Sequence, residues 1–407
     1  LLGGYLYHGD GASALKIFQR MKQDSIGPDR ITFLHLLKAY SLTKSIDDGY
    51  LIHYNIIILG LDSDVSIMTT LIDMYAKFES LEEACQIFDK SSVRNLVSWN
   101  AMIAGYVQQG YCLLAYEMFE KMKEDSILPD VSSWNVLIAG LTHREEGFSA
   151  LEAFGRMQRE GIQPNKVSFL CSLRACVTVG AVVPGQRIHD QIIRSGLESD
   201  IVVGNTIVDM YAKFGYLEEA HTVFNALSHQ DVVTWNALLV GYTEHEQDCS
   251  VLELFGKMQQ QHIEPDQFTL SCILKVCGNV GALEQGKIIH GKIFENYFKP
   301  DIVLASSLVD MYARCGSMKD AENVFYSLKR RDLASWNSMI AGYAQHGLCE
   351  LAIQCLIDMK KAGMMPSDTT YISVLTACSH SGELKGRDLF KSMTDDTVNP
   401  RIEHFNS

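Results

Sequence analysis

The sequence predicts an all-α protein built as a solenoid of helical hairpin repeats. Three features predict it: a Trp-Asn segment that returns in phase, a second segment that fixes the repeat boundaries, and regularly placed Gly and Pro. All four tryptophans are followed by Asn, in segments that begin at Val97, Ser133, Thr234 and Ser335. Such self-similarity is typical of proteins in which each repeat packs only against its neighbours.

The second segment, Asp-Met-Tyr-Ala followed by Lys or Arg, begins at Asp73, Asp209 and Asp310. Aligned with the Trp-Asn segment, it divides the chain into repeats of 31 or 35 residues, the last being one residue short. A partial repeat covers 1–29, and 402–407 begin a further, truncated repeat. Eleven tandem repeats cover 30–401 and begin at residues 30, 65, 96, 131, 166, 201, 232, 267, 302, 333 and 368.

Each repeat is expected to hold two helices. Apolar residues at helical spacing occupy the first ten or so positions, and a second amphipathic stretch follows. A glycine at the fifteenth position, such as Gly110, suits a helix end that needs a positive φ angle. Glu79, Glu145 and Glu246 take that place in three repeats. Proline near the end of most repeats stops the second helix, because it lacks the backbone N–H.

Composition excludes several classes of function. The net charge of −14 argues against a generally basic nucleic-acid binder, so any such binding must use a local surface. No apolar run approaches the ~20 residues of a membrane span. Eleven cysteines without a Cys-x-x-Cys pair indicate reduced thiols. His143-Arg144-Glu145 matches the start of a zinc deaminase signature, but its cysteine ligands are missing, so we expect no metal, cofactor or catalytic site.

Hairpins of this length with a Trp-Asn start and a Pro-Asp finish resemble the pentatricopeptide repeat family over essentially the whole chain. The alternating lengths resemble its plant PLS subclass. The short repeats would begin at 65, 201 and 302, the long ones at 30, 166, 267 and 368, and the standard ones at 96, 131, 232 and 333. The resemblance implies a right-handed α-superhelix, not an enzyme, that binds single-stranded RNA with one base per repeat.

The resemblance also implies that the fifth and last residues of a repeat, here called the base-reading pair, recognise one base. The implied pairs are Thr69 with Asn95 (adenine), Asn100 with Asp130, Asn205 with Asp231 and Asn236 with Asp266 (uracil), Asn135 with Asn165 (cytosine or uracil), Ser306 with Asp332 (guanine) and Asn337 with Ser367 (cytosine). In the long repeats Leu34, Leu170 and Ile372 cannot hydrogen-bond a base, and Ser271 is discounted with them. The implied target, 5′ to 3′ across 65–367, is A-U-C/U-n-U-U-n-G-C.

Two further sets follow from the same resemblance. Base-sandwiching residues occupy the second position of a repeat: Val97, Val202, Val233 and Val303. Ser66, Ser132 and Ala334 stand there in other repeats and would make weaker contacts. Phosphate contacts are expected from three cations one helical step past the middle of the first helix: Lys77, Lys213 and Arg314.

Other interpretations stay open. The Asn after Trp and the Pro-Asp finish are also typical of capping and turn chemistry, and the tryptophans are predicted to be core residues rather than RNA-stacking ones. A tetratricopeptide-like protein scaffold would suit the acidic balance, and an RNA-stabilising or splicing factor would need no enzyme. The resemblance implies a mitochondrion or chloroplast, with a targeting peptide outside this sequence. It also implies C-to-U RNA editing with editing-complex proteins and a deaminase, in cis beyond Ser407 or in trans.

Overall fold

The computed structural model describes residues 1–91, 93–295, 302–381 and 393. Every regular element among them is an α-helix, which confirms the predicted all-α class. The helices form two compact parts, Leu1–Met210 and Tyr211–Ser407, and each is described by itself. The expected second helix of repeat 368–401 and the segment 402–407 lie outside the described residues, apart from Met393.

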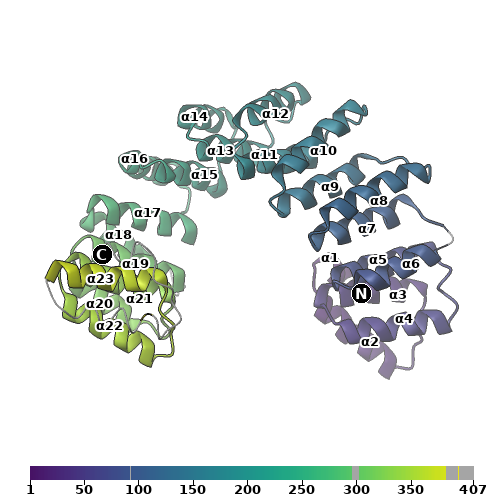
Figure 1. Ribbon diagram of the computed structural model, residues 1–407, viewed down its shortest axis with the longest axis horizontal. Helices are drawn as coiled ribbons and strands as arrows, with labels where there is room; N and C mark the ends of the chain where they lie inside the picture. Colours follow the sequence, from purple (N-terminus) through teal and green to yellow (C-terminus); the bar gives the residue numbers. More distant parts are fainter. Residues whose placement is uncertain (92, 296–301, 382–392, 394–407) are drawn as a thin grey trace. The chain divides into compact units, whose positions relative to one another are not determined.

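The N-terminal part consists of hairpins in which a first and a second helix alternate (Figure 1). The first helices are α1 (Leu2–Tyr7), α3 (Arg30–Thr43), α5 (Val65–Lys77), α7 (Leu96–Gln108), α9 (Val131–His143) and α11 (Lys166–Val179). The second helices are α2 (Gly11–Gln23), α4 (Ile46–Ile58), α6 (Leu81–Lys90), α8 (Cys112–Glu124), α10 (Gly147–Arg159) and α12 (Val182–Ser195).

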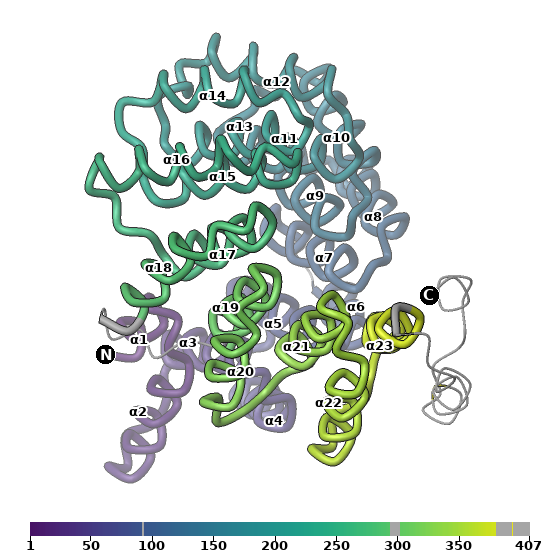
Figure 2. The backbone as a smooth tube through the Cα atoms, turned by 90° about the vertical axis from the view of Figure 1, so that its left-hand side faces the viewer, coloured from purple at the N-terminus to yellow at the C-terminus, as the bar shows by residue number. Residues whose placement is uncertain are grey.

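The C-terminal part continues the alternation, and the division between the parts falls within α13 (Ile201–Lys213). Its first helices are α15 (Val232–Glu244), α17 (Gln267–Val280), α19 (Ile302–Arg314), α21 (Leu333–Gln345) and α23 (Asp368–Ser381). Its second helices are α14 (Leu217–Ala226), α16 (Asp248–Gln260), α18 (Leu283–Glu295), α20 (Met318–Ser327) and α22 (Cys349–Lys361). Figure 2 shows α19, α21 and α23 in succession, with α20 and α22 beside them.

Two layers of helices result within each part. Successive first helices pack against one another, as α5, α7, α9 and α11 do, and second helices contact the first helix of their own repeat, as α8 does with α7 and α16 with α15. The second helix also packs on the first helix of the next repeat, as α10 does on α11 and α20 does on α21. Each part is therefore an α-solenoid whose first helices form one continuous layer.

The tryptophans join consecutive hairpins. Trp134 of α9 is fully buried, and its ring centroid lies 4.5 Å from that of Phe119 in the preceding second helix. Phe88 and Trp99 are 4.7 Å apart in the same arrangement. The Phe224–Trp235 and Phe325–Trp336 pairs of the C-terminal part repeat it at 4.7 Å and 4.8 Å. The prediction that the tryptophans are core residues is confirmed, because 5% or less of each is exposed.

Small residues and left-handed turns set the spacing of the first helices. A Cβ atom on Gly140 would lie 2.4 Å from Val107, and one on Gly342 would lie 2.7 Å from Ala313. These glycines therefore let neighbouring first helices approach closely. The described glycines at the fifteenth position have the expected positive φ. The glutamates that replace this glycine also have a positive φ, of 64° at Glu79 and 58° at Glu246.

The cysteines and the helix lengths agree with the sequence analysis. The eleven cysteines are free, and Cys176 and Cys277 are fully buried small side chains of the long repeats. Among the described helices, none combines the length and apolar character that crossing a membrane requires.

Candidate nucleic-acid interface

The last residue of a repeat is the N-cap of the next first helix. Asp266 precedes α17, and its Oδ1 accepts a hydrogen bond from the backbone N–H of Thr269 at 2.8 Å. The same contact occurs at the starts of other first helices, where the cap is Asp29, Asn95, Asp130, Asn165, Asp231 or Asp332. Capping contributes ~1 kcal/mol and accepts Asp, Asn and Ser alike. The capping interpretation is therefore correct for this residue, and capping by itself tolerates Asp, Asn or Ser at this position.

A second contact goes beyond capping. The Nδ2 of Asn236, the fifth residue of its repeat, donates to both carboxylate oxygens of Asp266 at 3.1 Å. The hydroxyl of Thr269 donates to Asn236 Oδ1 at 2.6 Å. Because a carboxylate only accepts hydrogen bonds, the amide orientation of Asn236 is chemically required. The fifth residue and the next N-cap thus form one hydrogen-bonded cluster on the first-helix layer.

Three more of the predicted base-reading pairs meet in the same way. Asn135 Nδ2 donates to Asn165 Oδ1 at 3.0 Å. The single proton of the Ser306 hydroxyl is shared between Asp332 Oδ1 at 2.9 Å and the Ile302 carbonyl at 2.8 Å. Asn337 Nδ2 lies 3.4 Å from Ser367 Oγ and 3.2 Å from Thr369 Oγ1.

The other predicted pairs differ. In the described residues, no hydrogen bond joins Thr69 to Asn95, and the Thr69 hydroxyl donates instead to the carbonyl of Val65 at 2.7 Å. No such bond joins Asn100 to Asp130 either, and Asn100 Oδ1 is buried without a partner. Asn205 belongs to the N-terminal part and Asp231 to the C-terminal part, so that pair remains a sequence prediction.

The predicted base-sandwiching valines are surface residues. Each lies in the first turn of a first helix and is between 46% and 60% exposed: Val97, Val202, Val233 and Val303. Exposed apolar side chains that recur in phase are consistent with a surface that contacts flat apolar groups. The structure thus places both sets of predicted residues on the first helices and at their starts.

Comparison with known proteins decides the family. The chain matches the PPR repeat family over residues 94–143, 129–178, 230–279 and 331–380. It matches the pentatricopeptide repeat domain over 1–41, and further single PPR repeats over 66–96, 205–230 and 303–333. A putative pentatricopeptide repeat-containing protein of Arabidopsis thaliana is 30% identical over 409 residues, with 100% of this chain and 55% of that protein covered.

The chain is a member of the pentatricopeptide repeat family. Two further relatives from Arabidopsis thaliana have names that give an organelle: a mitochondrial protein 32% identical and a chloroplastic protein 30% identical. This chain is covered completely by both, but spans 44% and 46% of their lengths, about half. Membership in this repeat family agrees with the expectation that the chain is not an enzyme.

Solved structures of the family share the fold. The pentatricopeptide repeat protein PPR10 in complex with an 18-nt psaJ RNA element has a TM-score of 0.65 at 19% identity and covers 100% of this chain and 69% of that one. PPR10 from maize has a TM-score of 0.52 at 20% identity, over 98% and 68% of the two chains. At these identities the likeness establishes the α-solenoid fold.

Some of the predicted phosphate-binding cations of these pentatricopeptide repeats are already paired. Lys77 Nζ lies 2.7 Å from Asp73, and Arg314 Nε lies 2.8 Å from Asp310, each one turn earlier on the same helix. Lys213 is exposed. The pairs at Asp73 and Asp310 partly neutralise their cations before any ligand arrives.

Sequence reasoning missed a second series of cations. The ninth residue of three long repeats is basic and exposed, namely Lys38, Arg174 and Lys275. In the described residues none of the three makes an ion pair within 4 Å. Each lies one turn after the fifth residue, on the same face of its helix. Comparing the ninth position between repeats would have revealed these cations. Comparing the second position would likewise have added Ile31, Val167 and Phe268 to the exposed apolar residues.

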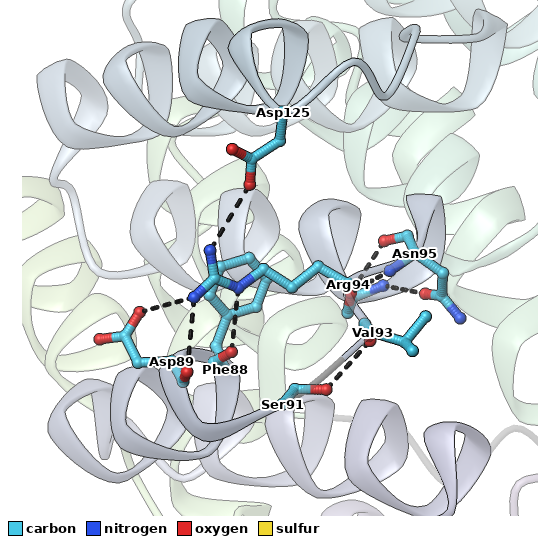
Figure 3. A network of polar contacts seen from close by, with 8 residues as sticks. Phe88, Asp89, Ser91, Val93, Arg94, Asn95 and Asp125 are labelled. Carbon is cyan, nitrogen blue, oxygen red and sulfur yellow. Dashed lines mark hydrogen bonds and ion pairs between the residues drawn. The ribbon is translucent and has the colours of Figure 1, made fainter.

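A recurring side chain holds the linker before the N-cap in the short repeats (Figure 3). Arg94 Nε donates to the carbonyl of Phe88 at 3.3 Å, and the guanidinium lies 4.9 Å from the Phe88 ring centroid. It also forms ion pairs with Asp89 at 3.6 Å and Asp125 at 3.5 Å. Arg331 makes the corresponding contact with the Phe325 carbonyl at 3.1 Å. These residues fix the approach to Asn95 and Asp332, at a place where five of the 35-residue repeats have proline.

We expect Arg94→Ala to lower the free energy of unfolding by about 1–2 kcal/mol, because it removes a charged hydrogen bond and a cation–π contact. Arg94→Gln is the matched control. Gln230 occupies the same place in another short repeat and donates to the Phe224 carbonyl at 3.0 Å, so Gln should retain most of the stability. Urea unfolding of both variants measures this, and equal losses for Ala and Gln would contradict the role assigned to the carbonyl contact.

The His143-Arg144-Glu145 segment lies at the end of a first helix. His143 ends α9, and Glu145 lies exposed in the turn with a φ of 63°. Within the part of the chain that the structure describes, no group of three or more His, Cys, Asp or Glu side chains is arranged to hold a metal ion. The fragment of the deaminase signature is therefore a helix end and its turn.

Proposed function

We propose that this chain binds single-stranded RNA by sequence, one base per repeat, as part of organellar RNA processing. The observation that carries the proposal is the cluster in which the fifth residue meets the next N-cap, seen at Asn135, Asn236, Ser306 and Asn337. Capping alone does not require this contact. The named mitochondrial and chloroplastic relatives, and the RNA bound to PPR10 in a structure of the same fold, support the proposal.

The cluster at Asn236 and Asp266 leaves the groups that uracil needs. An Asn amide has two N–H donors and two acceptor positions, and the contacts with Asp266 and Thr269 use one of each. Burial by itself raises the pKa of Asp266, but hydrogen bonds from Thr269 and Asn236 outweigh it and hold the pKa below its ordinary value. The carboxylate therefore stays ionised at neutral pH. Its Oδ2 can accept from the N3–H of uracil, while the amide pairs with a carbonyl of the base.

Asparagine at the last position inverts that pattern. Asn165 uses its Oδ1 to accept from Asn135 and from the Ser168 backbone, which leaves its side-chain NH₂ as a donor. A donor at this place suits the N3 acceptor of cytosine and not the N3–H of uracil. We therefore assign cytosine to the repeat 131–165 and uracil to the repeat 232–266, and the exposed second-position residues hold the ring from its faces.

The direct test is binding to the RNA A-U-C-n-U-U-n-G-C and to a scrambled strand of the same composition. We expect at least tenfold tighter binding to the target, because several base contacts of ~1 kcal/mol each are lost in the scrambled strand. Binding to both strands should weaken as salt rises. Equal affinity for the two strands would contradict sequence-specific binding. Binding insensitive to salt, or absent, would favour a tetratricopeptide-like protein scaffold.

The two cation series should differ in their contributions. Arg174→Ala and Lys275→Ala should each reduce the slope of log affinity against log salt by ~0.7, the value for one phosphate contact on a single strand. Lys77→Ala and Arg314→Ala should reduce it less, because their ion pairs with Asp73 and Asp310 must first be broken. Titrations of the four variants on the target RNA measure this. A larger effect at Lys77 and Arg314 would show the assignment to be wrong.

We further propose that the chain is of the PLS subclass and is the recognition part of a C-to-U editing factor. The alternating 31- and 35-residue repeats support this. The deaminase would then be supplied beyond Ser407 or by a partner. Sequencing organellar transcripts from plants that lack the protein should show one unedited cytidine beside the target string. Normal editing with reduced transcript or spliced product would instead favour the RNA-stabilising or splicing alternative.

A further inference from the structure

Two buried thiols meet where α22 packs on α23. Cys349 is the first residue of α22, Cys378 lies on α23, and each is 3% exposed. Their Sγ atoms are 3.1 Å apart, and either thiol can donate its S–H to the other. The two helices belong to the repeats 333–367 and 368–401, so the contact joins neighbouring repeats. Neither residue belongs to the base-reading, base-sandwiching or phosphate-binding sets.

The arrangement of the two side chains is close to that of a disulfide. The S–S bond of a disulfide is about 2 Å long, so the two sulfurs need to approach by about 1 Å to be joined. Cysteines whose side chains point apart cannot be joined without movement of the backbone. Here both side chains already point at each other from helices that are in contact. A small adjustment of the side chains is therefore enough.

The sequence brings two cysteines together at this junction alone. Cys349 is the seventeenth residue of its repeat, and Cys378 is the eleventh of the next. The eleventh residue is also cysteine in two other long repeats, but these follow repeats with Gly147 and Asp248 at the seventeenth place. Conversely, Cys112 stands at the seventeenth place of repeat 96–130, and the next repeat has leucine at the eleventh.

The same two places approach each other at another junction. A Cβ atom on Gly147 would lie 2.9 Å from the carbonyl oxygen of Ala175, the residue before Cys176, and 2.5 Å from Val179. The seventeenth residue of one repeat therefore packs directly on the first helix of the next, close to its eleventh residue. The contact of Cys349 with Cys378 thus follows from the way that the repeats stack.

We infer that Cys349 and Cys378 form a reversible disulfide that ties the repeat 333–367 to the repeat 368–401. The oxidant is hydrogen peroxide, which is small enough to reach thiols of low exposure. One thiol attacks the O–O bond and becomes a sulfenic acid as water leaves. The other thiol then attacks the sulfenic sulfur, and the S–S bond forms as a second water leaves. The thiols lose two electrons and two protons, which the peroxide gains. A dithiol reverses the bond by exchange and is itself oxidised to a disulfide.

The bond stabilises the contact between the two repeats. It closes a loop between residues 29 apart, which restricts the unfolded chain and so favours the folded state. It also holds the helix that orients Asn337, since the hydroxyl of Thr370 on α23 donates to Asn337 Oδ1 at 2.6 Å. We therefore expect the oxidised chain to unfold at a higher urea concentration than the reduced chain.

The test treats the purified, reduced chain with a few equivalents of hydrogen peroxide, blocks the remaining thiols by alkylation and digests the monomer without reductant. We expect a linked pair of tryptic peptides, 332–360 with 362–385, about 2 Da lighter than the two reduced peptides together. A dithiol added before alkylation should abolish the link and lower the urea midpoint. Because a dithiol does not reverse methionine oxidation, that change is common to both samples and does not enter the comparison.

Three variants assign the bond, because the peptide 332–360 also contains Cys355, another buried thiol of α22. Cys349→Ala and Cys378→Ala should each abolish the linked peptides and the difference in urea midpoint. Cys355→Ala is the matched control and should retain both. Circular dichroism of the reduced variants shows whether each of them is folded.

The exposed thiol of Cys249 reports whether the oxidant has acted. Oxidised Cys249 in a monomer that yields no linked peptides would overturn the inference. A link that persists in Cys349→Ala would overturn it as well, because the bond would then belong to Cys355. A link between Cys349 and Cys378 that leaves the urea midpoint unchanged would overturn the stabilising role of the bond.

Discussion

Replacing Asp266 by Asn is expected to move the base preference of the repeat 232–266 from uracil to cytosine. The change keeps the N-cap, because Asn caps a helix as well as Asp does. It replaces the carboxylate oxygen that would accept from the N3–H of uracil with an NH₂ donor. Each mismatched hydrogen bond costs ~1–2 kcal/mol, so the ratio of affinities for the two bases at nucleotide six should change by more than tenfold.

The reciprocal variant provides the control. Asn165→Asp should move the repeat 131–165 from cytosine to uracil at nucleotide three, with no effect at nucleotide six. Both variants are measured on target RNAs that differ by one base at one nucleotide. If neither variant changes the preference at its own nucleotide, the clusters of fifth residue and N-cap serve only to stabilise the helix starts.

The largest effect on stability is expected for Trp134→Ala. Trp134 is fully buried, packs on Phe119 at 4.5 Å between ring centroids, and has Lys123 at 5.3 Å over its ring. Removing a buried tryptophan costs about 3–5 kcal/mol. Since each repeat packs only on its neighbours, the loss should weaken the contact between the hairpins of repeats 96–130 and 131–165. Urea unfolding should show a lower midpoint and a less cooperative transition.

Trp134→Phe separates packing from RNA stacking. The Nε1 of Trp134 has no hydrogen-bond partner, so phenylalanine removes no hydrogen bond. The Phe variant should therefore lose ~1 kcal/mol or less of unfolding free energy, a smaller loss than that of the Ala variant. As a core residue it should leave RNA affinity within twofold of the original protein. A tenfold loss of RNA affinity in a stable Trp134→Phe variant would contradict the core role.

Spacing between repeated segments was enough to predict the helix pattern. The first helices of the full repeats begin at Arg30, Val65 and Leu96 and at each later predicted start. They do so because the last residue of a repeat is also the N-cap of the next first helix. The same chemistry limited the prediction of the site. Variation between Asp, Asn and Ser at the last position fits base reading and capping alike, because a helix N-cap tolerates the same three residues.

Contacts between repeats were harder to predict. Asn100 with Asp130 and Asn236 with Asp266 are identical in sequence, yet in the described residues only the second pair is hydrogen-bonded. Because the two repeats share the motif, the motif alone does not predict which pair forms the hydrogen bond. The ion pair of Lys77 was predictable, since Asp73 precedes it by four residues on the same helix.

Selection from a pool of random RNA tests the central claim most directly, because it presumes no target. We expect enrichment of one string, A-U-C-n-U-U-n-G-C, with little information at nucleotide four, where Leu170 stands at the fifth position of its repeat. The spacing of the specified nucleotides should follow the order of the repeats. Enrichment of an unrelated string, or of none, would contradict the claim that each repeat presents its fifth residue and the next N-cap to one base.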